Sequence, residues 1–383
     1  MSRFFDLVSK PAREMGGFLP VPLPKKTPAK AQARVIKLDS NENPFGPSPR
    51  ALEAMQSALT SANYYPDDDC GELRRKLAAH HDVGIDQVLV TAGSTALLGL
   101  LCQTMLAPGR NAVTSEQSFI VYSMAVHATG AQLIEAPMRE DRFDLAALLA
   151  AINEETRLVF LANPNNPTGT MLEAAEIDNF IAEAPSHVVV VVDEAYYEFA
   201  MRFADRRKVE YSHSLQHVRQ GASVIVLRTF SKAHGLAGLR VGYGLGPAEL
   251  LAYCARMRDT FSVSSAAQTA AIAALDDAKH IERVVSNNAE QAQILGVGLS
   301  ELGYRVVPTA ANFLYCDVNE DASVLAGRLR DEGVGVRPLG AWGAPSSIRV
   351  SIGTPEQNQI LLLSIRRIVA NGTSSPVDSS ANC

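Results

Sequence analysis

The stretch "HVVVVVDEAYYEF", residues 187–199, decides the fold. Its five consecutive valines form an apolar run without polar alternation, as expected for a strand buried on both faces of a sheet. Similar runs, separated by helical patterns, occur at residues 88–93, 131–138, 157–164 and 223–230. Strands that alternate with helices predict an α/β fold with a mainly parallel sheet.

The second half of the chain has a different pattern. Beyond residue 248, long helical stretches are followed by short strands expected at residues 304–308, 312–318 and 347–353, which indicates a smaller α+β domain. Near the start, Ser48 can cap a helix that begins at Pro49. The expected division is a large domain at residues 65–264, a small domain at 38–64 and 265–370, an extended N-terminal arm at 1–37 and a disordered tail at 371–383.

Composition argues against several classes of function. The chain has 383 residues, 47% apolar and 20% charged, so it can bury a large core. Its net charge of −6 gives no electrostatic reason to expect nucleic acid or an anionic membrane as partner. The five cysteines lack the close pairs of a metal site, and no metal is expected. Because no apolar stretch could span a bilayer and no signal segment is evident, we expect a soluble cytoplasmic protein.

Polar residues follow four of the apolar runs, at the sheet edge where parallel strands gather ligands. Gly93, Ser94 and Thr95 open an apolar helix whose first amides can bind an anion. The other ends carry an amide, a carboxylate and an amine, with a cation eight residues beyond the amine: Asn166, Asp193, Lys232 and Arg240. Singly, each has an ordinary explanation as a cap, a turn, a salt bridge or a surface residue. Together they suit pyridoxal phosphate, which has a phosphate, a phenolic oxygen, a pyridine nitrogen and an aldehyde that bonds to lysine.

Three motifs, in this order and spacing, carry a resemblance to a known family: "NPTG" at 166–169, "DEAYYEF" at 193–199 and "TFSKAHGLAGLRVGYG" at 229–244. The chain resembles the fold-type I aminotransferases of class I/II, most closely the histidinol-phosphate aminotransferase branch. "LDSNENPFGPSP", "NYYP" and "SIRVSIGT" extend the likeness to residues 38–370. The resemblance implies an aspartate-aminotransferase-like fold, with pyridoxal 5'-phosphate bound by the large domain.

The resemblance implies three catalytic residues. Lys232 is the lysine that bonds to the cofactor's aldehyde and then moves the proton of the substrate's α-carbon. Asp193 keeps the pyridine nitrogen protonated. Tyr196 and Asn166 hydrogen-bond the phenolic oxygen.

Further positions are implied for the cofactor. The phosphate is expected at the helix start and at three side chains further along the chain: Gly93, Ser94, Thr95, Thr229, Ser231 and Arg240. Phe119 matches the aromatic residue that stacks on the ring, although plain core packing explains it equally well. Tyr65 matches a tyrosine that reaches the cofactor phosphate of the other subunit, which implies a homodimer; the neighbouring Tyr64 leaves the register open.

The resemblance also implies that Arg349, Arg337 and Asn43 bind substrate. The bidentate fork of an arginine suits a carboxylate or phosphate. Two departures from the branch weaken the choice of substrate. Thr95 and Ala96 stand where many members have an acidic pair, and the proline-rich arm lacks the tyrosine-containing segment that helps to enclose substrate.

The expected reaction is transamination between an amino donor, with histidinol phosphate favoured, and 2-oxoglutarate. An aromatic or other amino-acid aminotransferase of the same branch is the first alternative, and a catalytically silent protein that binds pyridoxal phosphate is the second. A dinucleotide-binding oxidoreductase is a poor third, because the glycines at 242, 244 and 246 run into Pro247 without the third glycine of that fingerprint.

Overall fold

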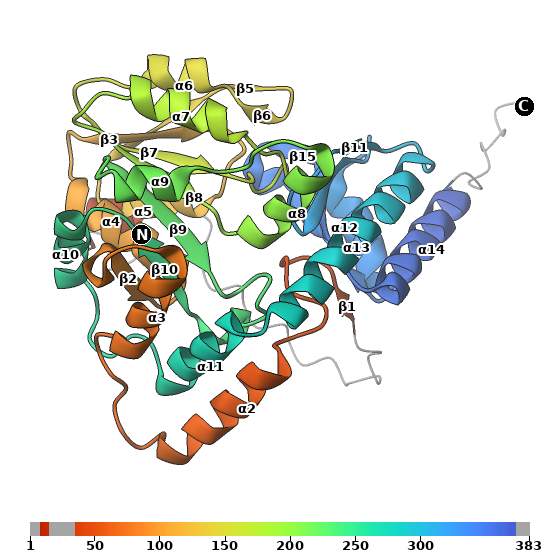
Figure 1. Ribbon diagram of the computed structural model, residues 1–383. Helices are drawn as coiled ribbons and strands as arrows, with labels where there is room; N and C mark the ends of the chain where they lie inside the picture. The colour runs from red at the N-terminus through yellow and green to blue at the C-terminus, as the bar shows by residue number, and fades with distance from the viewer. Residues whose placement is uncertain (1–7, 15–34, 373–383) are drawn as a thin grey trace, which may run out of the picture.

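A seven-stranded sheet forms the centre of the larger part of the molecule (Figure 1). The computed structural model describes residues 8–14 and 35–372. The strand at Gly242–Leu245, β10, runs antiparallel to the strands on both of its sides; the other pairs in this sheet are parallel. The predicted mainly parallel sheet is confirmed. In spatial order the strands are β2 (Val88–Thr91), β10 (Gly242–Leu245), β9 (Val224–Thr229), β8 (Val189–Asp193), β7 (Thr156–Ala162), β3 (Asn111–Ser115) and β4 (Gln132–Ala136).

Helices cover both faces of this sheet, which is why its central strands are apolar throughout. One layer contains α4 (Ser94–Met105), α5 (Val121–Ala128) and α10 (Ala248–Arg256). The other contains α6 (Leu145–Ala151), α7 (Ala174–Glu183) and α9 (Ser214–Arg219). The remaining elements of this part are α3 (Gly71–His81), η3 (Ile85–Gln87), η4 (Ala237–Leu239) and the hairpin of β5 (Met138–Arg139) and β6 (Arg142–Phe143).

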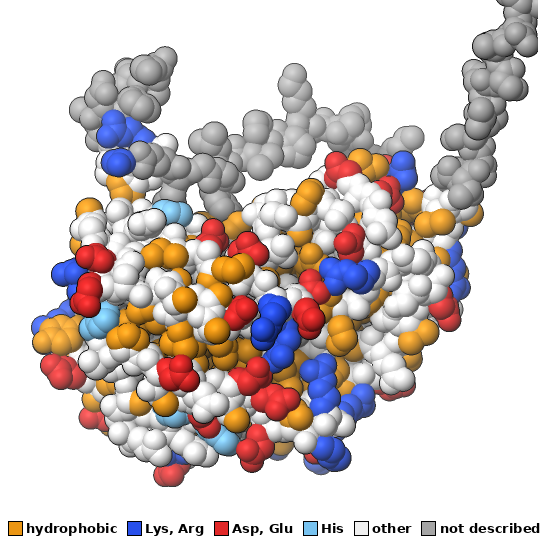
Figure 2. Space-filling model, turned by 90° about the horizontal axis from the view of Figure 1, so that it is seen from above, with side chains coloured by type: hydrophobic (Ala, Val, Ile, Leu, Met, Phe, Trp, Pro, Cys, Tyr) orange, Lys and Arg blue, Asp and Glu red, His pale blue; other side chains and the backbone are white. Residues whose placement is uncertain are grey.

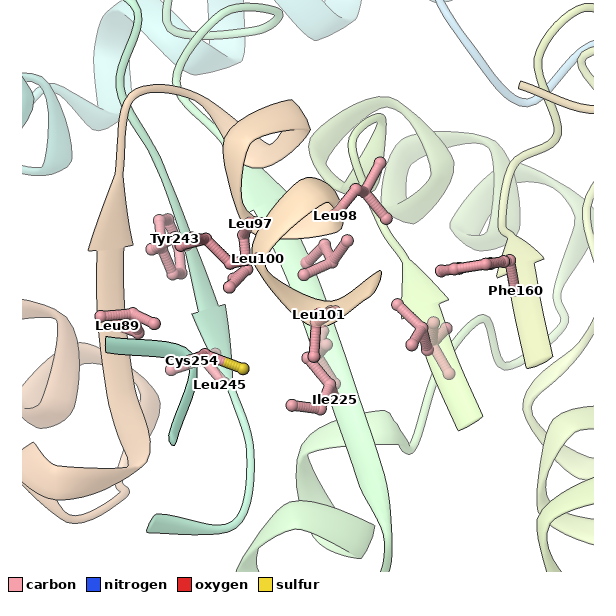
Figure 3. Packing of buried hydrophobic residues seen from close by; sticks show 14 of the residues in the cluster. Leu89, Leu97, Leu98, Leu100, Leu101, Phe160, Ile225, Tyr243, Leu245 and Cys254 are labelled. Atoms are coloured by element: carbon pink, nitrogen blue, oxygen red, sulfur yellow. The ribbon is translucent and has the colours of Figure 1, made fainter. Parts of the chain in front are cut away.

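Close packing of α4 on β10 depends on two glycines. Figure 3 shows leucines of α4, among them Leu97, lying against the neighbouring strands. A Cβ at Gly244 would lie 2.2 Å from Leu97 Cδ2, and one at Gly242 would lie 2.4 Å from the backbone nitrogen of Ser94. These glycines therefore let the start of α4 approach the sheet edge. They belong to a strand, so the dinucleotide-loop interpretation fails.

A second, antiparallel sheet lies beside the first. Its strands, in order, are β11 (Arg305–Val307), β12 (Phe313–Asp317), β15 (Ala344–Ser351) and β14 (Arg337–Leu339). The three strands expected from the sequence in this region are thus present. Helices α12 (Ala278–Ser300), α13 (Ala322–Asp331) and α14 (Pro355–Gly372) pack on it and on one another. Near the start of the chain, β1 (Ile36–Lys37) pairs in parallel with β13 (Val334–Gly335). Helix α8 (Tyr197–Arg207) packs against α12, and the short helix η5 (Gly340–Trp342) precedes β15.

Helix α2 (Pro49–Ala58) begins as predicted, because Ser48 Oγ accepts a hydrogen bond from the Ala51 backbone nitrogen at 3.2 Å. It continues into η2 (Leu59–Ser61) and packs along α11 (Ser265–Leu275), away from the second sheet (Figure 1). The buried alanines of α2 and α11 share the hydrophobic core of the seven-stranded sheet. The proposed boundaries after residues 64 and 264 stay a prediction.

The two ends of the chain were predicted to be irregular. Within the N-terminal arm, α1 (Lys10–Glu14) is a short helix next to α5, so the prediction of an extended conformation is wrong there. Most of the remaining arm lies outside the described residues. Helix α14 continues to Gly372, and the rest of the predicted tail lies outside the described residues.

Figure 2 views the molecule from the side of α6 and α7. Acidic and basic side chains are mixed there with hydrophobic ones, as is usual for a solvent-facing surface. Within residues 8–14 and 35–372, no helix combines the length and apolar character needed to cross a bilayer. Four of the cysteines are free and buried.

Candidate active site

A cavity of about 430 Å³ lies where the carboxyl ends of β7, β8 and β9 meet the start of α4. Its opposite wall comes from residues 40–42, from Arg337 and Arg349 of the second sheet and from Trp342 of η5. Most of the predicted site residues line it: Ser94, Thr95, Phe119, Asn166, Asp193, Tyr196, Thr229, Ser231, Lys232, Arg240, Arg337 and Arg349. Segments far apart in sequence therefore converge on one cavity.

Lys232 follows β9 and points into this cavity. Its Nζ donates a hydrogen bond to the Ser40 carbonyl oxygen at 3.2 Å and lies 5.7 Å from the centre of the Tyr196 ring. Burial, assisted by the positive charge of Arg349, lowers the pKa of Lys232 to about 7. A substantial neutral fraction near neutral pH makes this amine a nucleophile for carbonyl carbon.

Asp193 ends β8 as a carboxylate that is only 5% exposed. Its Oδ2 accepts a hydrogen bond from Tyr122 Oη at 3.0 Å, and its Oδ1 accepts one from the Ala195 backbone nitrogen at 3.2 Å. Burial raises the pKa of Asp193 to about 6, and both hydrogen bonds oppose that rise. Tyr122 was not predicted from the sequence, where its place three residues after Phe119 is the one hint; both residues line the cavity.

An anion cradle lies at the start of α4. Gly93 precedes this helix at φ +84°, and a Cβ there would lie 2.5 Å from Arg240 Nη2, so only glycine fits. Arg240 Nη1 donates to Ser231 Oγ at 3.3 Å, and Thr229 Oγ1 donates to the same oxygen at 3.0 Å. Arg240 makes no ion pair with any acidic residue of the described chain. A helix start, two hydroxyls and a guanidinium can together bind a phosphate.

Two arginines of the second sheet face the other end of the cavity. Arg349 Nη1 donates to Asn166 Oδ1 at 2.5 Å, and Nη2 donates to the Asp39 carbonyl oxygen at 2.9 Å. Its Nε is buried without a partner. Arg337 Nε lies 3.4 Å from the same Asp39 oxygen. Neither arginine forms an ion pair within residues 8–14 and 35–372, so this end suits a second anionic group.

Three predicted residues do not line the cavity. Tyr65 is 81% exposed and stacks on Phe261 with ring centres 4.5 Å apart. Asn43 donates to the Ala233 carbonyl oxygen at 2.8 Å and so anchors the segment before α2 next to Lys232. Gly93 lies behind the cavity wall, where it makes room for Arg240.

A larger cavity of about 880 Å³ adjoins the first and shares Phe119, Ile120, Tyr122 and Trp342 with it. Its wall contains neither Lys232 nor Asp193, so chemistry that needs this amine and this carboxylate belongs to the smaller cavity. In the described part of the chain, no cluster of three His, Cys, Asp or Glu side chains could hold a metal ion.

Comparison with known proteins shows which family this site belongs to. Residues 33–365 match the profile described as "Aminotransferase class I and II". The chain belongs to the class I and II aminotransferase family. Histidinol-phosphate aminotransferase of Moorella thermoacetica is 42% identical to it over 337 residues, which is 88% of this chain and 86% of that protein. Histidinol-phosphate aminotransferase 2 of Pseudomonas aeruginosa is 42% identical over 339 residues, with 88% and 90% covered.

Solved structures agree with this family assignment. The crystal structure of histidinol-phosphate aminotransferase from Sinorhizobium meliloti in complex with pyridoxal-5'-phosphate has a TM-score of 0.82 and 31% identity, and the match covers 88% of this chain and 91% of that one. Thermus thermophilus aspartate aminotransferase with maleate has a TM-score of 0.77 at 24% identity, covering 88% and 92%, and shows the fold alone. The predicted fold type I and the predicted enzyme class, an aminotransferase, are confirmed. The roles of individual site residues stay predictions.

Proposed function

We propose that this aminotransferase uses pyridoxal 5'-phosphate to transfer an amino group from histidinol phosphate to 2-oxoglutarate. One observation carries the proposal: a single cavity holds Lys232 of lowered pKa, the buried Asp193 carboxylate and arginines at both ends that lack acidic partners in the described chain. This arrangement suits a ring with a phosphate at one end and a second anion beyond it.

The residues present fit the cofactor. Because Gly93 has no side chain, the guanidinium of Arg240 can lie against it, next to the hydroxyls of Thr229 and Ser231. This group of residues at the start of α4, the phosphate corner, would hold the cofactor's phosphate. The carboxylate of Asp193 would hold a proton at the pyridine nitrogen. Bound pyridoxal phosphate would supply an electron sink for the substrate's α-carbon.

The chain's own residues have distinct tasks in this proposal. Lys232 would hold the cofactor through its Nζ, and this amine of lowered pKa would take up the proton of the substrate's α-carbon. Arg349 Nη1 donates to Asn166 Oδ1 at 2.5 Å and holds it in place, and Tyr196 would donate its hydroxyl proton to the phenolic oxygen of the bound cofactor. Phe119 lines the wall from which an aromatic ring can cover the cofactor.

The choice of histidinol phosphate rests on the second anion site and on the relatives. Arg337 and Arg349 lie together opposite the phosphate corner, and Arg349 Nε still lacks a partner. The relatives from Moorella thermoacetica and Pseudomonas aeruginosa carry the name histidinol-phosphate aminotransferase. An aromatic amino acid, whose carboxylate can bind the same arginines, is the second candidate.

A panel of amino donors tests the substrate. The enzyme is incubated with pyridoxal phosphate, 2-oxoglutarate and L-histidinol phosphate, phenylalanine, tyrosine or aspartate, and glutamate release is measured. We expect histidinol phosphate to give the highest kcat/KM and Lys232→Ala to give none. If histidinol phosphate is inert while an aromatic donor reacts, the substrate assignment is wrong. A protein that binds the cofactor but transfers no amino group from any donor would be a silent binder.

We also propose a homodimer with shared active sites. The exposed aromatic pair of Tyr65 and Phe261, with the exposed Leu59 and Tyr64 on the same segment, supports a second copy covering this surface. Mixing inactive Lys232→Ala with Tyr65→Ala should restore activity, because one site of the mixed dimer then has both residues intact. If mixing restores nothing although sedimentation shows mixed dimers, Tyr65 does not act across the interface.

A further inference from the structure

Asn41 is a buried residue between the two sheets that the sequence did not single out. It is 1% exposed and has φ +55°, in the left-handed region that asparagine and aspartate tolerate better than most residues. Its backbone nitrogen donates to Ser351 Oγ at 2.7 Å, and its carbonyl oxygen accepts from Asn312 Nδ2 at 3.0 Å. The backbone of Asn41 is thus tied to the second sheet on both sides.

The side chain of Asn41 has one orientation that satisfies its neighbours. Ser351 Oγ accepts from the Asn41 backbone and donates its own proton to Asn41 Oδ1 at 3.2 Å. The amide nitrogen is therefore turned toward the large sheet, where it donates to Tyr196 Oη at 2.9 Å. An amide nitrogen has no acceptor lone pair, so Tyr196 cannot place its hydroxyl proton on Asn41.

We propose that Asn41 is a positioning residue that makes Tyr196 a hydrogen-bond donor into the active-site cavity. By donating to the phenolic oxygen of Tyr196, Asn41 leaves the hydroxyl proton of that tyrosine for the cofactor. The inference rests on the proposed function, in which that proton is donated to the phenolic oxygen of pyridoxal phosphate. It adds to Tyr196, which follows β8, a partner from the segment between β1 and α2.

The surroundings of Tyr196 agree with a protonated, donating hydroxyl. The groups that face it are Arg349 from β15, Asp193 at the end of β8 and Lys232 after β9. Burial raises the pKa of Tyr196, against the opposing effects of Arg349 and the Asn41 hydrogen bond. The ring itself is fixed edge-on against Phe313, with centres 5.2 Å apart. The hydroxyl thus keeps its proton near neutral pH, and Asn41 determines where that proton points.

Asn41→Asp tests this inference because it reverses the polarity at one atom and tolerates the same backbone conformation. A carboxylate oxygen in place of the amide nitrogen accepts the Tyr196 proton and so withdraws it from the cofactor. The readout is the pH midpoint of the visible absorption change of the bound cofactor. A hydrogen-bond donor to the cofactor's phenolic oxygen favours the ionised form of that oxygen and so lowers this midpoint. Loss of the donor should therefore raise the midpoint by roughly one pH unit.

Four further variants separate the effect of the Tyr196 hydroxyl from that of the new charge. Tyr196→Phe should raise the midpoint by a similar amount, and adding Asn41→Asp to it should change the midpoint little further. Asn41→Gly, which suits φ +55° and carries no charge, should raise the midpoint by a smaller amount and replaces the aspartate variant if that one fails to fold. Asn358→Asp is the matched control, since Asn358 is also 1% exposed but bonds to Gln291 and Gly353, and its midpoint should stay unchanged.

The outcomes distinguish failure of the inference about Asn41 from failure of the proposed function. If Tyr196→Phe raises the midpoint while Asn41→Asp and Asn41→Gly do not, the inference about Asn41 is overturned and the proposed function stands. If Asn41→Asp raises the midpoint equally with and without the tyrosine hydroxyl, the new charge acts directly and the inference again fails. A parent protein that shows no visible band with pyridoxal phosphate overturns the proposed function itself, and this inference with it.

Discussion

A buried ion pair lies directly behind the catalytic strand ends, and breaking it should destabilise the enzyme strongly. Arg228 Nε and Nη2 donate to Glu194 Oε2 at 3.0 and 2.8 Å, and the side chains are only 6% and 0% exposed. The guanidinium carbon lies 3.4 Å from the centre of the Tyr197 ring, and Ser212 donates to the other carboxylate oxygen. The perturbation we choose is Arg228→Met, which keeps an unbranched apolar side chain but removes the guanidinium and leaves the carboxylate unpaired.

The magnitude follows from burial. Removing one partner of a buried pair leaves an uncompensated charge and costs about 3–5 kcal/mol. With an unfolding entropy of roughly 2.1 cal/mol/K per residue, the 383-residue chain has about 0.8 kcal/mol/K, so the thermal midpoint should fall by about 4–6 °C. Replacing both partners by apolar residues, as in Arg228→Met with Glu194→Leu, should restore most of that loss.

Thermal unfolding of the cofactor-free protein, followed by scanning calorimetry, measures these midpoints. The matched control is Arg366→Met, because Arg366 pairs with Glu301 at 3.7 Å and both side chains are more than half exposed; its midpoint should change by less than about 1 °C. The reasoning is refuted if Arg228→Met lowers the midpoint no more than Arg366→Met, or if the double variant is as unstable as the single one.

Three other predictions concern the site and its support. Gly93→Ala should weaken binding of pyridoxal phosphate about ten- to hundredfold in a fluorescence titration, because its Cβ displaces Arg240 from the phosphate corner; unchanged affinity would mean that another group binds the phosphate. Tyr122→Phe removes a donor that holds down the pKa of Asp193, about 6 in the parent, so the acidic limb of the kcat/KM profile should move to higher pH, and an unshifted limb would contradict this. Gly244→Ala should lower the stability by about 1–3 kcal/mol through overpacking, and an unchanged melting temperature would show that the α4 side chain opposite it relaxes freely.

The strands that could be predicted from the sequence are those whose buried residues are almost all apolar. The valine run before Asp193 lies at the centre of the sheet, where both faces are covered. Strand β3 was missed because its sequence, "NAVTS", is partly polar although every residue is buried. Those polar groups are satisfied locally: Thr114 donates to the Phe160 carbonyl oxygen and Ser115 to that of Ala136. Burial with satisfied hydrogen bonds leaves no apolar signal.

Strand β10 was missed for a different reason. It contains the glycines at 242 and 244, and glycine is depleted in strands because it offers no side chain to pack. The glycines are needed because α4 approaches the strand so closely that a Cβ would overlap Ser94 or Leu97. Only the tertiary arrangement reveals that requirement, whereas the sequence equally fits a glycine-rich loop.

The site residues also divide into those that the sequence predicts and those that depend on tertiary contacts. For residues that follow parallel strands, such as Asp193 and Lys232, the sequence predicts that they lie close together, because parallel strands end at one edge of the sheet. Asn41 could not, since its hydrogen bonds reach Tyr196 across 155 positions and Ser351 across 310. What such a residue contributes is orientation of a proton, which depends on which atom of a neighbour is already engaged. A motif can therefore name the group that touches the cofactor, but the direction in which that group donates is decided by contacts that only the folded chain makes.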